Sequence, residues 1–441
     1  MSELRRVLMV SPHFPPDSTA ATHRVRLLAP HLPAYGWEPT IVTVDPRDYE
    51  GRLDPILARS VPSGLRVVPV RAWPARLSRP FGLGDLGLRA FTALKATTMR
   101  LLAASRFDAL FITIYPTYPA LLGPVLKRRF GVPFVLDYQD PWVGEWGKSA
   151  GPRVNGKPDL KSRASRLAAM RLEPLALRAA DGVTAVSRAT FEQALARNPG
   201  SHPVVTEEIP IGWDRGDLQF LRLSGASGRI PSRDGLVHFS YVGTVLPTGI
   251  DTVKALLSAV ARLRQRAPAR VEKLRLHFFG TSNQRASNAR PRVLPLAREL
   301  GVADLVTEQP GRLDYFEALR TLLDSSGILL LGSRERHYTP SKVFPALMSD
   351  RPIVAICHEA SPAAELLRRV GRPPSIWLVT YCDESPASER VDAIAGVFAD
   401  MGANPRFDET VLDRTAMEPS SAVQLAGRLA RVLDRVATRK G

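Results

Sequence analysis

Residues 235–250 read GLVHFSYVGTVLPTGI, and this stretch decides how the chain is divided. The apolar run Leu236–Val242 predicts a β-strand that ends at Gly243. The amphipathic stretch Asp251–Gln265 follows and predicts a helix. The same succession of apolar run, polar loop and amphipathic helix already starts at Arg6. Because this pattern begins twice, the sequence predicts two α/β domains in tandem.

The apolar runs on both sides of this stretch show no clean alternation, as expected of strands buried on both faces of a parallel sheet. In the first half they are Arg6–Val10, Thr40–Val44, Leu65–Val70, Ala109–Ile114, Pro133–Asp137, Gly182–Val186 and Val204–Ile209. In the second half they are Leu236–Val242, Leu274–Phe279, Asp304–Val306, Gly327–Leu331, Pro352–Cys357 and Ser375–Thr380. We therefore predict two doubly wound, Rossmann-like domains with an interdomain cleft, and ligands at the carboxyl ends of the strands.

The joint between the domains is predicted near residues 214–234, where Gly, Ser, Arg and Asp dominate. This gives a first domain over residues 1–220 and a second over residues 235–420. The amphipathic segment Ser421–Ala437 predicts a final helix.

Composition narrows the class of protein. The 441 residues carry 60 Lys and Arg against 43 Asp and Glu, a net charge of +17. This surplus favours anionic partners, namely nucleic acid, acidic lipid or phosphorylated small molecules, although scattered arginines also reflect a GC-rich genome. Two cysteines in so long a chain argue against a disulfide framework and a Cys-based zinc site. With no targeting peptide or membrane span in the sequence, we expect a cytoplasmic protein that touches a membrane peripherally at most.

The loop after the first predicted strand, residues 11–21, contains no glycine. A dinucleotide fold needs Gly-x-Gly-x-x-Gly here, so NAD and FAD binding are not expected. The loop is rich in Pro and Ser and leads into a basic helix start. It forms either one wall of the cleft, in contact with a sugar or an anionic ligand, or a capped helix start with solvated arginines. Its candidate contacts on the acceptor side are His13, Pro16, Ser18 and Thr19.

The fifth predicted strand runs into Asp137-Tyr138-Gln139-Asp140-Pro141-Trp142. Indole faces stack on sugars, and carboxylates bind hydroxyls or accept protons. Asp140 is therefore a candidate catalytic residue, and Trp142 a candidate acceptor contact. In the alternative interpretation Asp137 caps a turn and Trp142 fills the domain core.

Two strand ends of the second half carry glycine, in Gly243-Thr244 and Gly280-Thr281. Glycine there lets backbone amides approach a phosphate closely. In the segment 337–344, Thr339 predicts an N-cap and Pro340 a first helical position, which puts Lys342 in the first turn. The helix dipole disfavours a cation there unless an anion such as a diphosphate is bound. The alternative is a solvated lysine beside an ordinary cap.

Sequence motifs typical of metal sites and of nucleic-acid-binding modules are missing. It contains no His-x-x-x-His, no His-Glu-x-x-His and no Asp-x-Asp, so we expect a metal-independent mechanism. Zinc-finger spacing and basic–aromatic pairs are also missing, so no nucleic-acid partner is expected.

Taken in order, these motifs resemble the GT-B glycosyltransferases of the family 4 group over nearly the whole chain. The resemblance rests on the loop with Pro15-Pro16, Asp137-x-x-Asp140-Pro141-Trp142, residues 180–187, Tyr241-Val242-Gly243-Thr244 and Pro340-Ser341-Lys342-Val343-Phe344. It implies transfer of a sugar from a nucleotide donor with retention at the anomeric carbon, without a metal or another cofactor. It also implies that the second domain binds the donor and that the final helix, within residues 421–441, packs back on the first domain. The donor contacts carried over by the resemblance and by the glycine argument are Gly243, Thr244, Gly280, Gly311, Arg312, Tyr338, Ser341 and Lys342.

The sequence departs from this family at the two glutamates that usually stand eight positions apart. Those positions hold His337 and Pro345, and Gln139 stands where the family often has His. The missing ribose carboxylate would weaken donor binding by about 1–3 kcal/mol. A non-catalytic relative that serves as a binding or partner subunit therefore stays open, and a nucleotide-sugar epimerase is a further alternative.

We expect a lipid-linked or polysaccharide acceptor of cell-surface glycan synthesis, at the inner face of the cell membrane. The support is the basic content of the first domain, which would contact anionic lipid. The alternative is a set of solvated charges. The residues concerned are Arg79, Arg89, Lys95, Arg100, Lys127, Arg128 and Arg129.

Overall fold

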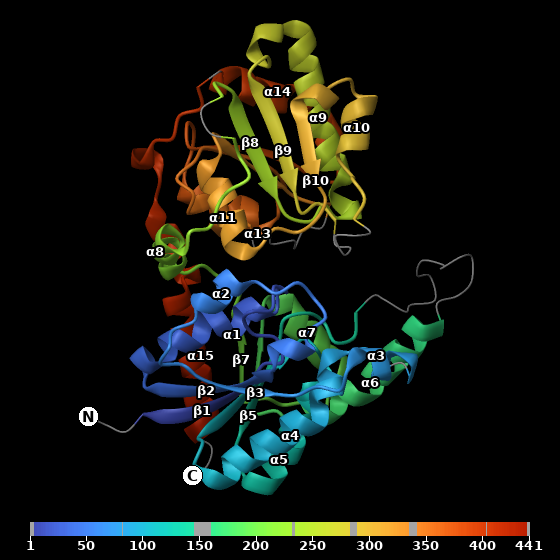
Figure 1. The fold of residues 1–441 in the computed structure, drawn as a ribbon, viewed down its shortest axis with the longest axis vertical. Helices are drawn as coiled ribbons and strands as arrows, with labels where there is room; N and C mark the ends of the chain where they lie inside the picture. The colour runs from blue at the N-terminus through green and yellow to red at the C-terminus, as the bar shows by residue number, and fades with distance from the viewer. Residues whose placement is uncertain are drawn as a thin grey trace. The chain divides into compact units, whose positions relative to one another are not determined.

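The computed structural model describes residues 4–81, 83–144, 160–231, 234–282, 289–334, 342–402 and 404–438. It divides into two compact units, each treated by itself below (Figure 1). The first unit is Met1–Asp214 together with Ser420–Gly441, and the second is Arg215–Pro419. Residues 215–220 thus lie in the second unit, whereas the sequence prediction had placed them in the first.

The first unit is built on a parallel sheet that has seven strands within the described residues, in the order β3-β2-β1-β4-β5-β6-β7. The middle strands are apolar and buried, and every residue of β4 is inaccessible to solvent. The strands are β1 (Arg5–Val10), β2 (Trp37–Val44), β3 (Arg66–Val70), β4 (Ala109–Ile114), β5 (Phe134–Tyr138), β6 (Gly182–Ala185) and β7 (Val205–Glu208). The helices are α1 (Thr22–Leu28), α2 (Pro55–Arg59), α3 (Ala75–Ser78), α4 (Leu86–Ala104), α5 (Leu122–Phe130), α6 (Leu160–Leu177), α7 (Arg188–Arg197) and α15 (Ala422–Ala437).

The C-terminal helix α15 packs on the first unit, where Figure 1 shows it in red against the blue strands. Its apolar stripe, which includes Leu425, Leu429 and Leu433, lies in the same core as residues of β1 and β4. The Asp434 carboxylate accepts a hydrogen bond from Trp37 Nε1 at 3.0 Å and pairs with Arg5 at 2.8 Å. The end of the chain therefore completes the unit in which the chain begins.

The second unit has a parallel sheet with six described strands in the order β10-β9-β8-β11-β12-β13. Helices α9 and α14 pack against one another. The strands are β8 (Val237–Val242), β9 (Leu274–Phe279), β10 (Val306–Gln309), β11 (Gly327–Leu331), β12 (Ile353–His358) and β13 (Ile376–Tyr381). The helices are α8 (Arg215–Ser224), α9 (Ile250–Arg266), α10 (Leu294–Glu299), α11 (Tyr315–Asp324), α12 (Val343–Leu347), α13 (Pro362–Val370) and α14 (Val391–Met401).

The predicted fold class, two doubly wound α/β domains, is confirmed by these two parallel sheets. The strand predicted at Asp304–Val306 is misplaced, because residues 303–305 form a 3-10 turn and β10 begins at Val306. β10 is an edge strand that pairs only with β9 among the described strands, and an edge strand can contain polar residues such as Thr307–Gln309. Because these residues are polar, the apolar pattern did not predict this strand at its true position. The predicted cleft between the domains stays a prediction.

Among the described residues, no helix combines the length and the apolar character that a membrane crossing requires.

Candidate functional site

The carboxyl ends of β8 and β9, which are neighbours in the second sheet, carry Gly243 and Gly280. Both have positive φ angles, +137° and +69°. A Cβ at Gly243 would overlap the side chain of Lys342, and a Cβ at Gly280 would lie 3.7 Å from the Cα atoms of Arg312 and Gly243. Gly243 therefore leaves room for Lys342, whereas the contacts at Gly280 are of ordinary length and its positive φ angle is what favours glycine.

The predicted approach of a phosphate to backbone amides at these strand ends stays a prediction, but the amides of the two glycines themselves are already bonded. The Gly243 amide donates to the Phe279 carbonyl at 2.7 Å, and the Gly280 amide donates to the Gln309 carbonyl at 2.9 Å. Both bonds continue the pairing of the parallel strands, so neither amide is available to a ligand. What Gly243 provides is space for the side chain of Lys342.

Lys342 lies over the end of β8. Its Nζ donates to Tyr241 Oη at 2.8 Å and to the Thr244 carbonyl at 3.2 Å, and it lies 4.6 Å from the centroid of the Tyr241 ring. We call Tyr241, Gly243, Thr244, Arg312 and Lys342 the Lys342 cluster. Tyr241 was not selected as a site residue from the sequence, because it lies within the predicted strand Leu236–Val242 and fits the apolar pattern of that strand.

The position of Lys342 relative to its helix differs from the prediction. Helix α12 begins at Val343, so Lys342 stands at the N-cap position and not in the first turn. The proposed cap Thr339 and the candidate residues Tyr338 and Ser341 lie outside the described residues, as does His337.

The electrostatics of the Lys342 cluster favour a negatively charged ligand. Burial and, to a smaller extent, the nearby Arg312 guanidinium together lower the pKa of Lys342 to about 7. Both oxygens that accept hydrogen bonds from Nζ in the described structure are neutral. A half-buried ammonium group beside a second cation is unfavourable until an anion neutralises it.

The loop with Gly311 and Arg312 follows β10 and leads into α11. The Pro310 carbonyl accepts a hydrogen bond from the Ser282 amide at 3.1 Å, which ties this loop to the end of β9. Arg312 is exposed. Pro345, which takes the place of the ribose-binding glutamate of the resembling family, lies inside α12.

The first unit places a second charged cluster after β1. The His13 ring is 2.6 Å from Asp17, through Nδ1 and Oδ2. The same carboxylate accepts hydrogen bonds from Thr19 Oγ1 at 2.5 Å and Thr22 Oγ1 at 3.1 Å. Burial on its own would raise the pKa of Asp17, but the bonds from His13, Thr19 and Thr22 outweigh it and hold the pKa below its ordinary value.

Aromatic rings enclose the His13 side of this cluster. The centroid of the His13 ring lies 6.1 Å from that of Tyr49 and 5.7 Å from that of Tyr115. Asp85 contributes an N-cap to α4, and burial raises the pKa of its carboxyl. Asp85 and Tyr115 were missed because their loops are far from His13 in the sequence, whereas Asp17 stands in the same loop as His13 and was not selected there.

The remaining residues of the predicted acceptor-side loop are engaged within the loop region. Ser18 Oγ donates to the Arg52 carbonyl at 2.8 Å, and the Pro16 carbonyl accepts from the Asp54 amide at 2.7 Å. These bonds fix the loop against the segment before α2.

The two candidate residues of the loop after β5 differ in exposure: Asp140 reaches the surface and Trp142 does not. Asp140 is an exposed residue whose carboxyl is partly desolvated, and this desolvation raises its pKa. Trp142 is 2% exposed and packs in the core of the first unit, so its ring offers no free face for stacking. Asp137 caps no turn. It is fully buried in β5, paired with Arg24 at 2.9 Å and bonded to Thr184 at 2.7 Å.

One of the basic residues expected to face a membrane, Arg89, does not reach the surface, and two others are engaged in ion pairs. Arg89 is 4% exposed and donates to the carbonyls of Trp73 and Asp48. Arg79 pairs with Glu50 and Lys127 with Asp181. Among the described residues, no three His, Cys, Asp or Glu side chains are grouped as metal ligands.

Comparison with known proteins identifies the first unit. Residues 19–210 match the family model described as "Glycosyl transferase 4-like domain". The first unit is therefore similar to the glycosyl transferase 4-like domains. The predicted resemblance to GT-B glycosyltransferases of the family 4 group is thereby confirmed, and so is the prediction of a transferase enzyme.

Solved structures share the fold of this chain over nearly its whole length. HepE from Anabaena in complex with UDP matches with a TM-score of 0.52 and 14% identity, covering 99% of both chains. A UDP-forming α,α-trehalose-phosphate synthase from Burkholderia vietnamiensis matches with a TM-score of 0.58 and 12% identity, covering 99% of both chains. A synthase of the same name from Burkholderia xenovorans matches with a TM-score of 0.57 and 12% identity, covering 98% of this chain and 99% of the other. No curated protein has a significantly similar sequence.

Proposed function

We propose that the protein transfers a sugar from a nucleotide-diphosphate sugar to a hydroxyl group of a lipid-linked or polysaccharide acceptor in cell-surface glycan synthesis. The observation that carries this proposal is the Lys342 cluster, where Lys342 and Arg312 meet at the carboxyl end of a parallel sheet without an anionic partner for Lys342 Nζ in the described structure. A diphosphate is the anion that both cations could bind together. The UDP in the HepE complex, a protein with a similar fold, supports the same choice of ligand class.

In the proposed reaction the acceptor oxygen forms a bond to the anomeric carbon, and the bond from that carbon to the phosphate oxygen breaks. Lys342 stabilises the negative charge that develops on the leaving diphosphate. We propose that transfer proceeds with retention and without a metal ion, which rests on the resemblance to family 4. The proton of the acceptor hydroxyl then goes to the leaving diphosphate, and Asp140 orients the acceptor hydroxyl.

The first test is thermal stabilisation of the protein by UDP, GDP, ADP and CMP. A nucleotide at about 100 times its dissociation constant should add about 2.7 kcal/mol to the free energy of unfolding. Lys342→Ala should lose this stabilisation. Lys254→Ala, which removes a half-exposed lysine of the same unit outside the Lys342 cluster, should keep it. Stabilisation that survives in Lys342→Ala would contradict the proposed donor site, and so would the lack of any effect in the unaltered protein.

We further propose a peripheral contact of the first unit with an anionic membrane that presents the acceptor. The support is a pair of exposed apolar side chains, Trp73 and Leu77, which are 61% and 62% exposed next to the exposed Arg76. The double substitution of Trp73 and Leu77 by Ser should lower sedimentation with vesicles that contain phosphatidylglycerol. Leu223→Ser, which alters an 83% exposed leucine of the second unit, is the control. Equal sedimentation of all three proteins would rule out this contact.

A further inference from the structure

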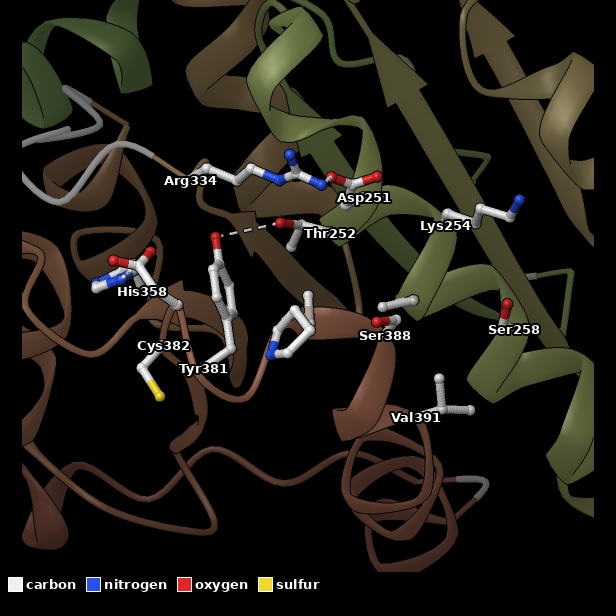
Figure 2. Close-up of a pocket in the computed structure, with 14 residues that line it drawn as sticks. Asp251, Thr252, Lys254, Ser258, Arg334, His358, Tyr381, Cys382, Ser388 and Val391 are labelled. Atoms are coloured by element: carbon white, nitrogen blue, oxygen red, sulfur yellow. Dashed lines mark hydrogen bonds and ion pairs between the residues drawn. The ribbon is translucent and has the colours of Figure 1, made fainter.

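A cavity of about 440 Å³ opens in the second unit between α9 and the segment that joins β13 to α14 (Figure 2). Figure 2 shows Thr252 and Ser258 on the α9 side, and Tyr381 and Ser388 on the other side. No residue of the Lys342 cluster lines this cavity. Its volume lies in the range of sites that hold small molecules.

The inner wall of the cavity is fixed by the Tyr381 hydroxyl. This hydroxyl donates to the Ser333 carbonyl at 2.9 Å and accepts a hydrogen bond from Thr252 Oγ1 at 3.2 Å, which Figure 2 marks with a dashed line. Burial raises the pKa of Tyr381 to about 12, so the hydroxyl keeps its proton. The ring is therefore held in place as a rigid part of the cavity wall.

His358, which also lines the cavity, has a hydrogen-bonding group that the protein does not use. The residue is 3% exposed, and its Nδ1 accepts a hydrogen bond from the Ala360 amide at 3.2 Å. This bond places the proton of the neutral ring on Nε2, which is then a donor. Within the described structure Nε2 is buried and has no hydrogen-bond partner, and Oδ1 of Asp383 lies 3.5 Å away. A buried donor without a partner costs free energy that a ligand oxygen would recover.

The charges around the cavity balance. Lys254 and Arg334 contribute two positive charges, and Asp251 and Asp383 contribute two negative charges. Arg334 and Asp251 form an ion pair at 2.5 Å. An anion would meet the carboxylates and a cation would meet the basic groups, so neither is favoured over a neutral ligand. A hydroxyl group both donates and accepts, and can thus serve His358 Nε2 and the Asp383 carboxylate at once.

We infer that this cavity is a second ligand site, separate from the Lys342 cluster, that binds a neutral sugar of one or two rings. The apolar face of the sugar ring lies against the exposed Pro386. Its hydroxyls meet His358 Nε2, Asp383 and the Ser388 hydroxyl. The site does not depend on the proposed transfer reaction, because its walls and polar groups lie outside the Lys342 cluster.

The test is saturation-transfer NMR with the full-length protein and three probes, namely glucose, N-acetylglucosamine and maltose. At least one probe should receive saturation from the unaltered protein. Ser388→Trp fills the cavity from an exposed position and should weaken that binding at least about tenfold. Ser63→Trp places the same ring on an exposed loop of the first unit and should leave binding unchanged. If no probe receives saturation, or if Ser388→Trp binds as well as the unaltered protein, the inference is wrong.

Two further measurements separate this site from the Lys342 cluster and test the ligand class. Lys342→Ala should bind the probe as the unaltered protein does, and UDP should not displace the probe. Displacement by UDP would place the sugar at the Lys342 cluster and overturn the inference. Inorganic phosphate should also fail to compete, and Asp383→Asn should change affinity by less than about threefold, because the amide still accepts and donates hydrogen bonds. Competition by phosphate, or much tighter binding to Asp383→Asn, would mean that the cavity selects an anion instead of a neutral sugar.

Discussion

Each of the two units places a charged cluster at the carboxyl ends of parallel strands. The two clusters differ in whether the protein itself provides partners that compensate the charge. In the first unit the buried Asp17 carboxylate is bonded to His13, Thr19 and Thr22. In the second unit Lys342 reaches only the neutral oxygens of Tyr241 and Thr244 within the described structure. The first cluster is satisfied by the protein itself, whereas the second lacks a negative charge.

This difference separates a structural role from a binding role. A satisfied buried carboxylate holds a loop in place and stabilises the fold. A buried ammonium group without an anion costs stability, and a protein retains such a group where a ligand provides the missing charge. Substitutions in the two clusters should therefore change stability in opposite directions.

The largest effect is expected from Asp17→Ala in the first unit. The substitution leaves His13 and two threonine hydroxyls without their acceptor, so the free energy of unfolding should fall by about 3–5 kcal/mol. Denaturant unfolding measures the loss. Asp17→Asn keeps an oxygen acceptor and should lose less. A loss below about 1 kcal/mol in Asp17→Ala would mean that the cluster does not hold the loop.

Lys342→Met should have the opposite sign in the absence of nucleotide. Methionine replaces the ammonium group with an apolar end of similar length, and the free energy of unfolding should rise by about 1–4 kcal/mol. The same substitution should abolish stabilisation by the nucleotide that protects the unaltered protein. Denaturant unfolding with and without that nucleotide measures both effects. If Lys342→Met is less stable than the unaltered protein, the hydrogen bonds of Lys342 outweigh its burial, and the contrast between the clusters fails.

The sequence could predict the fold because its strongest signals coincide with burial. The runs Ala109–Ile114, Leu274–Phe279 and Gly327–Leu331 are strands with the predicted bounds, and nearly all of their residues are buried. The one misplaced strand, β10, lies at a sheet edge, where exposed polar residues erase the apolar pattern. Local patterns thus predict a strand well where apolar residues predominate, as in the edge strands β3 and β13, and poorly where polar residues take their place, as in β10.

For the candidate site, the sequence could predict which strand ends lie together, because the topology of a parallel sheet determines that. Gly243 and Gly280 follow strands that were predicted in the second domain, and parallel strands bring such ends together at one edge. Which groups are free there depends on pairing and side-chain direction. The engaged glycine amides, the burial of Trp142 and the inward position of Arg89 therefore became visible only in three dimensions.

A smaller effect is expected from Gly243→Ala, which tests whether space for Lys342 matters. The new Cβ would overlap the Lys342 side chain, and the φ angle of +137° disfavours any side chain. We expect the free energy of unfolding to fall by about 1–3 kcal/mol, together with weaker nucleotide binding. Gly301→Ala is the matched control, because Gly301 also has a positive φ and nothing within 4 Å of its Cβ position. If both variants lose the same stability and both bind nucleotide normally, steric room at Gly243 is irrelevant.

A further effect is a pH dependence that belongs to Lys342. Burial lowers its pKa from 10.5 to about 7 in the folded chain. Between these two pH values the unfolded chain holds the proton and the folded chain has released it, so the free energy of unfolding should rise with pH, by at most about 1.4 kcal/mol per pH unit. Below pH 7 both states are protonated and the full cost of the buried charge remains.

The stability advantage of Lys342→Met should therefore shrink as the pH rises from about 7 to about 9. A bound diphosphate should reverse the shift, because it holds the proton on Lys342, so nucleotide binding at about pH 8 should take up a proton. Calorimetry in buffers of different ionisation enthalpy measures this uptake, and Lys342→Met should show none. An advantage that does not change with pH, together with binding that takes up no proton, would mean that Lys342 is already charged in the free protein. The second cluster would then tolerate its charge without a ligand, and the contrast with Asp17 would no longer point to an anion site.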